Sequence, residues 1–239
     1  MMYHHVNSDR CSNDYAIFEK HLEYVSMHFT TLFPTTQQLP KNAICLVFDD
    51  GYYDFYRLIY PLLKKYKLKA LLGVVPSVTL ESCALDDTTR LAPEHNDLFQ
   101  EYKKGTFCTY EELKEMQESG HVQIASHSLR HVNLLEDHVS LYEELKVSQE
   151  ILEKELNTKV ESFIFPFGKY NQKVLEETQK YYKYAFRIGN GVNPDFNGVN
   201  GVIYRIDGDN LKNASSIFSF KNIIRFKLKT LIKKIAGNR

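Results

Sequence analysis

Short, mostly apolar segments that alternate with helical segments are the feature that most limits the fold of this chain. The longer runs cover residues 43–48, 69–75, 121–125 and 160–165, and two shorter ones cover residues 184–188 and 202–206. Strands that are apolar on both sides are typical of parallel sheets, which are covered on both faces. The alternation therefore predicts a single α/β domain with a parallel sheet, either open or closed into a barrel.

The helical segments and the loops complete this pattern. We expect a first strand over residues 1–6 and helices over residues 15–29, 52–66, 109–120, 139–156 and 172–182. The third helix opens with Thr109-Tyr-Glu-Glu112, which is a capping-box pattern. Residues 77–107 show no clear period and are expected to form an inserted loop. We predict one domain over residues 1–211, followed by a tail over residues 212–239.

Composition excludes several classes of protein. An apolar content of 43% is too high for a disordered chain. Lys+Arg and Asp+Glu both number 30, but eight of the basic residues and no acidic residue fall in the tail. The predicted domain is therefore mildly acidic, which is not typical of a nucleic-acid-binding domain. We accordingly expect no nucleic-acid partner.

The cysteines and the N-terminus bear on the cellular compartment. The four cysteines are far apart in the sequence and form no Cys-x-x-Cys pair, so neither a zinc finger nor a disulfide framework is expected. No apolar run reaches the 18 residues of a membrane span. The first residues lack the basic and apolar regions of a secretory signal. These features predict a cytoplasmic location.

Asp49 and Asp50 directly follow the apolar run over residues 43–48. Reactive groups of α/β folds lie at the carboxyl ends of strands, where this pair is expected. Two buried, charged carboxylates are costly unless a cation offsets them. Neighbouring residues on an extended segment point in opposite directions, so one can bind a metal while the other faces a substrate. The alternative is a solvated turn or a cap for the following helix.

His127 and His131 lie four positions apart and follow the strand predicted over residues 121–125. This spacing places both imidazoles on one face of a helical turn, which suits joint binding of a cation. The alternative is two incidental surface histidines, among the nine in the chain. Together with Asp50 they would leave coordination positions open for water and substrate, and such a set accepts Zn, Co, Ni or Fe.

Three motifs in order give the pattern more specificity. Val47-Phe-Asp-Asp-Gly51, His127-Ser-x-x-His131 and Phe165-Pro-Phe-Gly168 resemble the successive motifs of the polysaccharide deacetylase family (NodB-homology, carbohydrate esterase family 4). The resemblance covers residues 1–207. It implies a distorted (β/α) barrel of about seven parallel strands and one divalent metal ion, most often zinc. It also implies removal of acetyl groups from N-acetylated sugars or from O-acetylated xylan.

The resemblance assigns a role to each motif residue. Asp49 would be the general base, and Asp50, His127 and His131 would hold the metal. The metal and Asp49 would activate a water molecule for attack on the acetamide carbonyl. The backbone N–H of Phe167 would join the metal in stabilising the tetrahedral oxyanion.

The chain departs from the family pattern at two places. The family's Arg two residues before the motif Pro is Ile164 here, and no His follows His138 to act as the family's C-terminal acid. The segment Tyr3-His4-His5-Val6 resembles the poly-N-acetylglucosamine deacetylase branch, in which the acid His precedes the Asp-Asp motif and an apolar residue commonly replaces the Arg. His4 is therefore the expected general acid and His5 the fallback. The alternative is that this segment is only the polar end of a first strand.

Arg205 lies at the end of the last predicted strand. It is expected either to orient an acid in the site or to be an ordinary surface residue. The chain as a whole is expected to remove the N-acetyl group from a sugar in a glycan or, in the cytoplasm, a glycan precursor. The alternatives are a catalytically silent glycan-binding member of the fold, or a deacylase of another small N-acyl or O-acyl compound. The sequence leaves the oligomeric state open.

The tail contains a basic amphipathic segment over residues 220–235. Its Lys and Arg residues lie largely opposite an apolar stripe with helical spacing, formed by Phe220, Ile223, Ile224, Leu228, Leu231, Ile232 and Ile235. One interpretation is peripheral contact with the inner face of a membrane, where basic residues meet anionic lipid. The other is a helix that packs on the domain through the same stripe.

Overall fold

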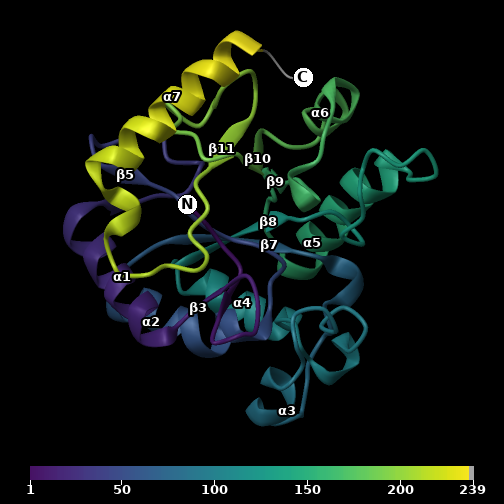
Figure 1. Cartoon of the computed structure of the whole chain (residues 1–239). Coiled ribbons are helices and arrows are strands. Elements are labelled where there is room, and N and C mark those ends of the chain that lie inside the picture. Colours follow the sequence, from purple (N-terminus) through teal and green to yellow (C-terminus); the bar gives the residue numbers. More distant parts are fainter. Residues whose placement is uncertain (237–239) are drawn as a thin grey trace.

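The computed structural model describes residues 1–236, and its main sheet is a seven-stranded parallel sheet that curls into a nearly closed barrel (Figure 1). Its strands are, in spatial order, β1 (Met2–Tyr3), β6 (Leu46–Phe48), β7 (Ala70–Val74), β8 (Val122–Ser126), β9 (Ser162–Ile164), β10 (Tyr184–Ile188) and β11 (Ile203–Arg205). The segment after β11 returns to β1, where an isolated parallel bridge joins Met2 to Asp207. The predicted distorted barrel is confirmed.

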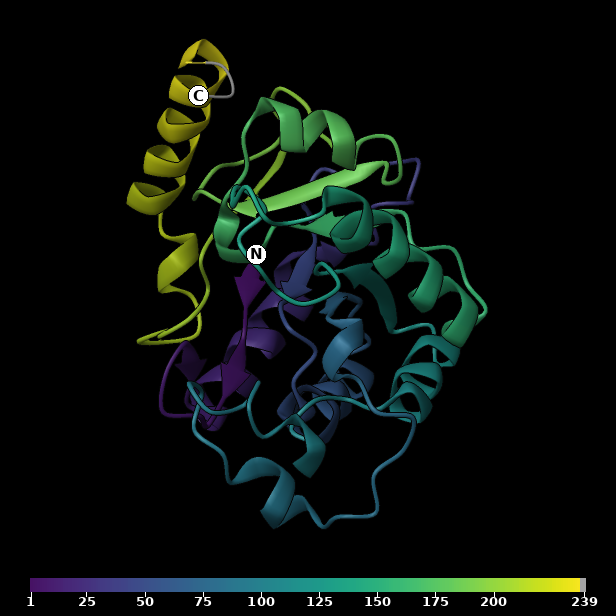
Figure 2. The same ribbon diagram turned by 90° about the vertical axis from the view of Figure 1, so that its right-hand side faces the viewer.

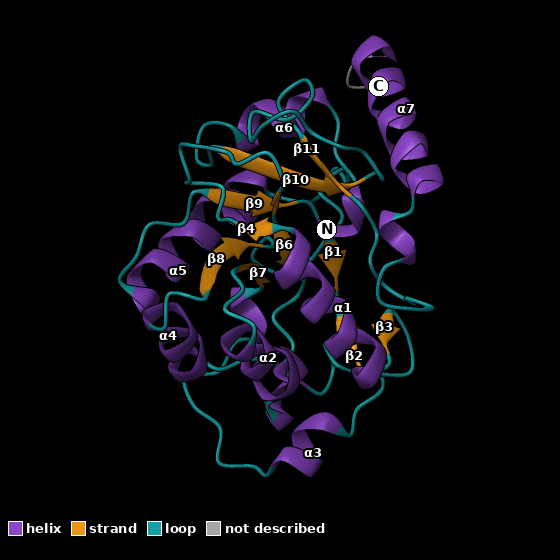
Figure 3. Ribbon diagram, turned by 90° about the vertical axis from the view of Figure 1, so that its left-hand side faces the viewer, coloured by secondary structure: helices purple, strands orange, loops and turns teal. Residues whose placement is uncertain are grey.

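Helices surround the barrel (Figure 2, Figure 3). They are α1 (Tyr15–His28), α2 (Tyr60–Lys65), α3 (Asp87–Leu91), α4 (Tyr110–Glu118), α5 (Ser148–Leu156), α6 (Gln172–Thr178) and α7 (Phe220–Ala236). Two of the predicted helices begin with π-helical segments, Phe55–Ile59 before α2 and Tyr142–Val147 before α5. Short 3₁₀ segments cover Pro76–Val78, Tyr102–Lys104, Pro166–Gly168 and Ser216–Phe218. Within residues 1–236, no helix has the length and apolarity that a membrane crossing requires.

Two strands predicted as continuous are divided. Residues 1–6 form β1 and β2 (His5–Val6), because the backbone N–H of His4 donates to the Asp209 carboxylate at 3.1 Å instead of to a strand. Residues 43–48 form β5 (Ala43–Ile44) and β6, because the Cys45 carbonyl accepts from the Met1 ammonium at 2.8 Å. The first fragments pair elsewhere, β2 with β3 (Ser12–Asn13) and β5 with β4 (Thr30–Thr31).

The apolar core lies on both sides of the sheet, as expected for a parallel sheet with mostly apolar strands. One face of the strands fills the barrel with a cluster of Val47, Leu71, Ala125, Ile164, Tyr184, Phe186 and Ile203. The alternate residues, such as Phe48 and Leu72, belong to the larger cluster that also includes buried residues of the helices. Because the interior is packed, the space for a ligand lies at the end of the barrel and not along its axis.

A buried arginine, Arg90, helps to fix the inserted loop over residues 77–107 to the domain. Arg90 is nearly fully buried, donates to the carbonyl of Gly105 at 2.7 Å and pairs with Glu112 at the start of α4. Thr109 and Glu112 form the predicted capping box at the same place. The loop is thereby held against the carboxyl ends of the strands, where it supplies His95 and Phe99 to a cavity.

Candidate active site

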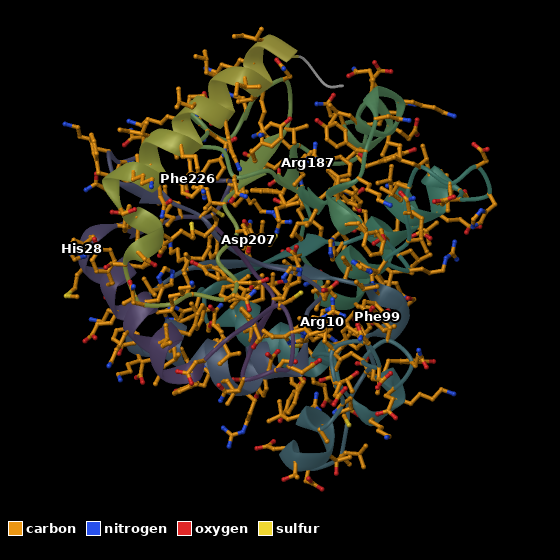
Figure 4. The ribbon with its side chains drawn as sticks, in the orientation of Figure 1. Arg10, His28, Phe99, Arg187, Asp207 and Phe226 are labelled. Carbon is orange, nitrogen blue, oxygen red and sulfur yellow. The ribbon has the colours of Figure 1, made fainter. Side chains whose placement is uncertain are left out.

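The residues singled out by the sequence meet at the carboxyl ends of the barrel strands. Asp49 and Asp50 follow β6, His127 follows β8, Phe167 follows β9 and Arg205 ends β11. They line a cavity of about 480 Å³, which His4 and residues of the inserted loop also line. The labelled Phe99 marks the inserted loop in Figure 4, in the orientation of Figure 1. Parallel strands thus bring together side chains from across the whole chain.

Asp50, His127 and His131 form a compact cluster within the cavity. The Asp50 Oδ1 atom lies 3.4 Å from the His127 Nε2 atom and 3.3 Å from the His131 Nε2 atom. One potential ligand atom from each residue lies within 4.8 Å of the other two. The structure therefore brings together the three residues that the sequence predicts as ligands.

The helical turn predicted for residues 127–131 is wrong. Ser128 and His131 have φ angles of 64° and 53°, in the left-handed region, so the segment is an irregular loop. The loop is held by a hydrogen bond from the His131 N–H to the Ser128 hydroxyl at 2.9 Å, and by one from the Leu129 N–H to the Glu144 carbonyl at 3.2 Å. The two imidazoles still converge, but through loop geometry and not through helical periodicity.

The chemistry of this cluster fits a divalent cation. Asp50 Oδ1 is buried and has no hydrogen-bond partner among the described residues. The Nδ1–H of His127 donates to the Ile164 carbonyl at 2.8 Å, which leaves the lone pair on Nε2 facing Asp50. Burial, which disfavours the imidazolium, lowers the pKa of His127 to about 4. Burial alone would raise the pKa of Asp50, but His131 and His127 more than offset it, so the carboxylate is ionised.

Asp49 is held by Arg205, which ends β11 at the seam where the barrel closes beside β1 and β6. The guanidinium forms two hydrogen bonds with the carboxylate, one of them from Nη2 to Oδ2 at 2.9 Å, and both side chains are buried. Burial opposes ionisation of Asp49, but Arg205 offsets it and lowers the pKa of the carboxyl below its ordinary value. The sequence expectation for Arg205 is corrected on two counts. It is no surface residue, and its partner is the predicted base instead of an acid.

His4 lies beside Asp49, with its Nε2 atom 3.8 Å from Asp49 Oδ2. Its Nδ1 atom makes a 2.6 Å hydrogen bond to Asp209. Burial by itself lowers the pKa of His4, but the bond to Asp209 and the charges of Asp49 and Asp50 raise it to about 9. His4 is therefore protonated at neutral pH, and the proton on Nε2 faces the cavity. The Cys11 thiol is close to the same pair, within 4.8 Å of a ligand atom of each.

His5 points away from Asp49 and belongs to a different group. Its Nδ1 and Nε2 atoms lie 3.1 Å from Asp54 Oδ2 and from His95 Nδ1, respectively. Its ring stacks on Tyr52 at a centroid distance of 3.9 Å. His95 lines the cavity, whereas His5 and Asp54 lie behind it. The geometry therefore separates the two histidines that the sequence leaves as first choice and fallback.

Phe167 forms part of the mouth of the cavity. Its φ angle of 58° turns the backbone of the Pro166–Gly168 segment, and 58% of the residue surface is exposed. The His131 ring lies between the rings of Phe167 and Phe99, at centroid distances of 4.6 and 5.0 Å. Aromatic faces at the rim and polar groups at the base are typical of a small-molecule site.

Asp209 and His95 are among the residues of this site that sequence reasoning misses. Asp209 stands in an acidic pair around Gly208, directly after the last strand, and this placement repeats the signal that singles out Asp49 and Asp50. His95 lies in a loop without periodicity, so only its residue type marks it. Their partners His4 and His5 are 205 and 90 residues away in the sequence, and no local pattern connects such pairs.

The topology and the cluster together define the class of the molecule. It is a (β/α) barrel whose strand ends carry a buried group of two histidines and a carboxylate, next to a second carboxylate paired with arginine.

The chain belongs to the polysaccharide deacetylase family, whose model matches residues 36–185. This range includes all three motifs. His4, Arg205 and Asp209 lie outside it, at the two ends of the domain. Those ends close the barrel and complete the site.

The chain is also similar to individual proteins of known sequence or structure. YxkH of Bacillus subtilis (strain 168), named for this family, is 24% identical over 194 residues, covering 75% of this chain and 60% of YxkH. The poly-β-1,6-N-acetyl-D-glucosamine N-deacetylase of Escherichia coli O157:H7 is 27% identical over 183 residues, covering 64% of this chain and 26% of that protein. The chain thus spans less than two thirds of either relative. Its fold matches Streptococcus pyogenes deacetylase PplD in complex with acetate, with a TM-score of 0.72, 24% identity and coverage of 95% and 96%.

Proposed function

We propose that the protein is a metal-dependent N-deacetylase that acts on an N-acetylated sugar. The observation that carries this proposal is that one cavity holds both a candidate metal site and a candidate acid–base pair. The Oδ1 atom of Asp50, which has no hydrogen-bond partner among residues 1–236, faces the imidazoles of His127 and His131. The protonated His4 lies 3.8 Å from the separate carboxylate of Asp49. Amide hydrolysis needs both an electrophilic centre and a proton donor for the leaving amine.

Asp50, His127 and His131 are the proposed ligands of the divalent ion. The ion would supply Lewis-acid polarisation of the acetyl carbonyl and would lower the pKa of a water molecule. Zinc is the first choice, and cobalt, nickel and iron suit the same donors. Asp50 is also the only ligand of the three that carries a negative charge, so its loss removes both a donor and charge compensation.

Asp49 is the proposed general base and His4 the proposed general acid. Asp49 is kept ionised by Arg205 and can accept the proton of the attacking water. At neutral pH His4 carries a proton on both ring nitrogens: the Nδ1–H donates to Asp209, and the Nε2–H faces Asp49. His4 can therefore donate that proton to the amine as the C–N bond breaks.

The rim of the cavity supports a sugar as the substrate. Phe167 and Phe99 line the cavity beside His131, and its volume of about 480 Å³ is of the size that small ligands occupy. The backbone N–H of Phe167 is the proposed partner of the oxyanion. One relative is named as a deacetylase of poly-β-1,6-N-acetyl-D-glucosamine, so an N-acetylglucosamine unit is the first substrate to test.

An acetate-release assay tests this proposal. The purified protein is stripped of metal and incubated with N-acetylglucosamine oligomers, O-acetylated xylan and small N-acyl amides, each with Zn, Co, Ni or Fe. The proposal expects metal-dependent acetate release from the sugar amides. Release from the ester or small amides alone would support a different deacylase. Saturable glycan binding without release under any metal would support a silent binding protein.

We also propose that the enzyme works in the cytoplasm, at the inner face of a membrane, on a glycan precursor. All four cysteines are free thiols, and Cys11 is part of the cavity lining, which suits a reducing compartment. Fractionation of cells that express the protein tests this location. Recovery with secreted proteins, or with disulfide bonds formed, would contradict it.

A further inference from the structure

Helix α7 carries an apolar surface that faces away from the rest of the protein. Six of the thirteen exposed large apolar side chains in the described residues lie on this one helix. Phe220, Ile235 and Ile232 are 82%, 78% and 63% exposed. The outward face, as we call it, consists of Phe220, Ile224, Leu228, Leu231, Ile232 and Ile235. An exposed apolar patch of this kind marks an interaction surface.

The helix is attached to the body by a different face. Phe226 and Thr230 are its buried residues, and the Thr230 hydroxyl accepts from the Val192 N–H at 2.8 Å. Lys233 lies over the Tyr204 ring at 4.9 Å from the centroid. At about 100° per residue, the attached residues lie on the side of the helix roughly opposite the outward face. The outward face is therefore not needed to hold the helix in place.

The pictures agree with this geometry. Figures 2 and 3 show α7 at the edge of the molecule, with one side toward the barrel and the other toward solvent. Figure 4 labels Phe226 on the stretch of α7 that meets the body. The two interpretations of the tail are thus compatible. The helix packs on the domain, and most of its predicted apolar stripe remains free.

The positive charge of α7 indicates an anionic partner. Over Phe220–Ala236 the helix has six Lys or Arg residues and no acidic residue. At about 100° per residue, Arg225 borders the outward face on one side, and Lys227 and Lys234 border it on the other. Lys221 lies at the N-terminal end of the face, between the directions of Leu228 and Ile232, and all four residues are exposed. An apolar face bordered by cations is complementary to a surface with an apolar interior and anionic headgroups. A second copy of α7 would instead bring like charges together.

We propose that the outward face of α7 binds an anionic lipid surface, with its apolar side chains in the acyl boundary and its basic borders among the headgroups. The helix contacts Val192, in the segment that leaves β10, and β10 ends at Ile188 in the lining of the cavity. Lipid binding would therefore hold the cavity at a fixed position relative to the membrane. The proposal concerns α7 and does not depend on the deacetylase activity.

Vesicle co-sedimentation of the full chain tests the proposal. The probes are phosphatidylcholine vesicles and vesicles of phosphatidylcholine mixed with phosphatidylglycerol, each at low and high salt. We expect binding to the anionic vesicles only, weakened by salt because screening shortens the reach of the charges. Leu228→Ser, Leu231→Ser and Ile232→Ser together should weaken binding by more than about tenfold, because less apolar surface enters the boundary.

Charge and apolar controls separate the two contributions. Lys221→Gln, Arg225→Gln, Lys227→Gln and Lys234→Gln should each weaken binding about fivefold. Met27→Ser and Tyr142→Ser remove exposed apolar side chains outside α7 and should leave binding unchanged. All variants should keep the melting temperature and the acetate release from a soluble substrate, so failure of the lipid proposal is distinguishable from failure of the enzyme proposal.

Three results would overturn the proposal. Absence of binding to anionic vesicles at low salt is the first. Equal binding by the wild type and the triple serine variant is the second. The third is a dimer of the wild type, seen by light scattering, that the triple variant converts to a monomer while neither protein binds vesicles. That result would assign the outward face to a second copy of the chain.

Discussion

At the scale of single residues, His4 and Asp49 each have a charged partner that shifts the pKa of the side chain. Asp209 accepts from His4 at 2.6 Å, and this bond helps raise the pKa of His4 to about 9 against the effect of burial. Arg205 does the reverse for Asp49, whose pKa lies below the ordinary value for an aspartate. The two groups are thus held in the protonation states that an acid and a base require.

The Asp209→Asn variant tests the role of the partner of His4. Because the amide carries no charge, the pKa of His4 falls, and the acid loses its proton at lower pH. We expect the alkaline fall in kcat/KM to move from near pH 9 to lower pH, with bound metal unchanged. A pH–rate profile of both proteins measures the shift. An alkaline limb at the same pH in both would show that His4 is not the acid, or that Asp209 does not set its pKa.

Arg205→Gln tests the buried pair. Removing one partner of a buried ion pair leaves Asp49 uncompensated and should cost about 3–5 kcal/mol of unfolding free energy at neutral pH. Arg205 lowers the pKa of Asp49, so its stabilisation is present above the unfolded pKa, about 3.9, and is lost as pH falls through the folded value. Urea unfolding should therefore show a difference in unfolding free energy between the wild type and Arg205→Gln that becomes smaller at acid pH.

The control for this pair is the double variant Asp49→Asn with Arg205→Gln. It removes both charges and should recover part of the lost stability, as a coupled pair requires. Strictly additive losses in the double-mutant cycle would mean that the two side chains do not interact in the folded protein.

At the scale of elements, the sequence predicts regular structure well and irregular structure poorly. The strands near residues 70–74, 122–126 and 184–188 are recovered because apolar runs report burial on both faces. The turn at residues 127–131 is missed because the left-handed φ values of Ser128 and His131 depend on contacts with Glu144, which lies in a different element. The π-helical segment Tyr142–Val147 is missed because periodicity does not distinguish it from an α-helix.

The capping box of α4 gives a prediction at this scale. Thr109 accepts from the Glu112 N–H and the Glu112 side chain accepts from the Thr109 N–H. Thr109→Ala should lower stability by about 1 kcal/mol, which is about 2–4 °C in Tm for a chain of this size. Thr35→Ala, at an exposed position outside any helix, is the matched control. Equal melting temperatures for the two variants would contradict a stabilising cap.

For the whole molecule, the site depends on closure of the barrel. His4 and Asp209 are 205 residues apart, and Arg205 and Asp49 are 156 residues apart. These pairs form because the segment after β11 returns to β1 beside β6. Sequence reasoning finds the motif residues, since they follow apolar strands, but it does not find Asp209 or the partner of Arg205. Such contacts are a property of the closed sheet and not of any local pattern.

Metal binding should stabilise the folded chain as a whole. An ion at a concentration of 100 times its Kd adds about 2.7 kcal/mol if it binds only the folded state. For a chain of this length we expect the Tm to rise by about 5–10 °C with zinc. The Asp50→Ala variant should show no rise. A similar zinc-dependent rise in both proteins would place the ion elsewhere.

The most direct test of the central claim measures bound metal and acetate release together on the wild type, Asp49→Asn and Asp50→Ala. We expect the wild type to hold one metal ion and to release acetate from an N-acetylated sugar. Asp49→Asn should keep the ion and lose on the order of 10²–10⁴-fold in rate, whereas Asp50→Ala should lose both the ion and the activity. Near wild-type turnover by Asp49→Asn, or full metal content in Asp50→Ala, would contradict the account.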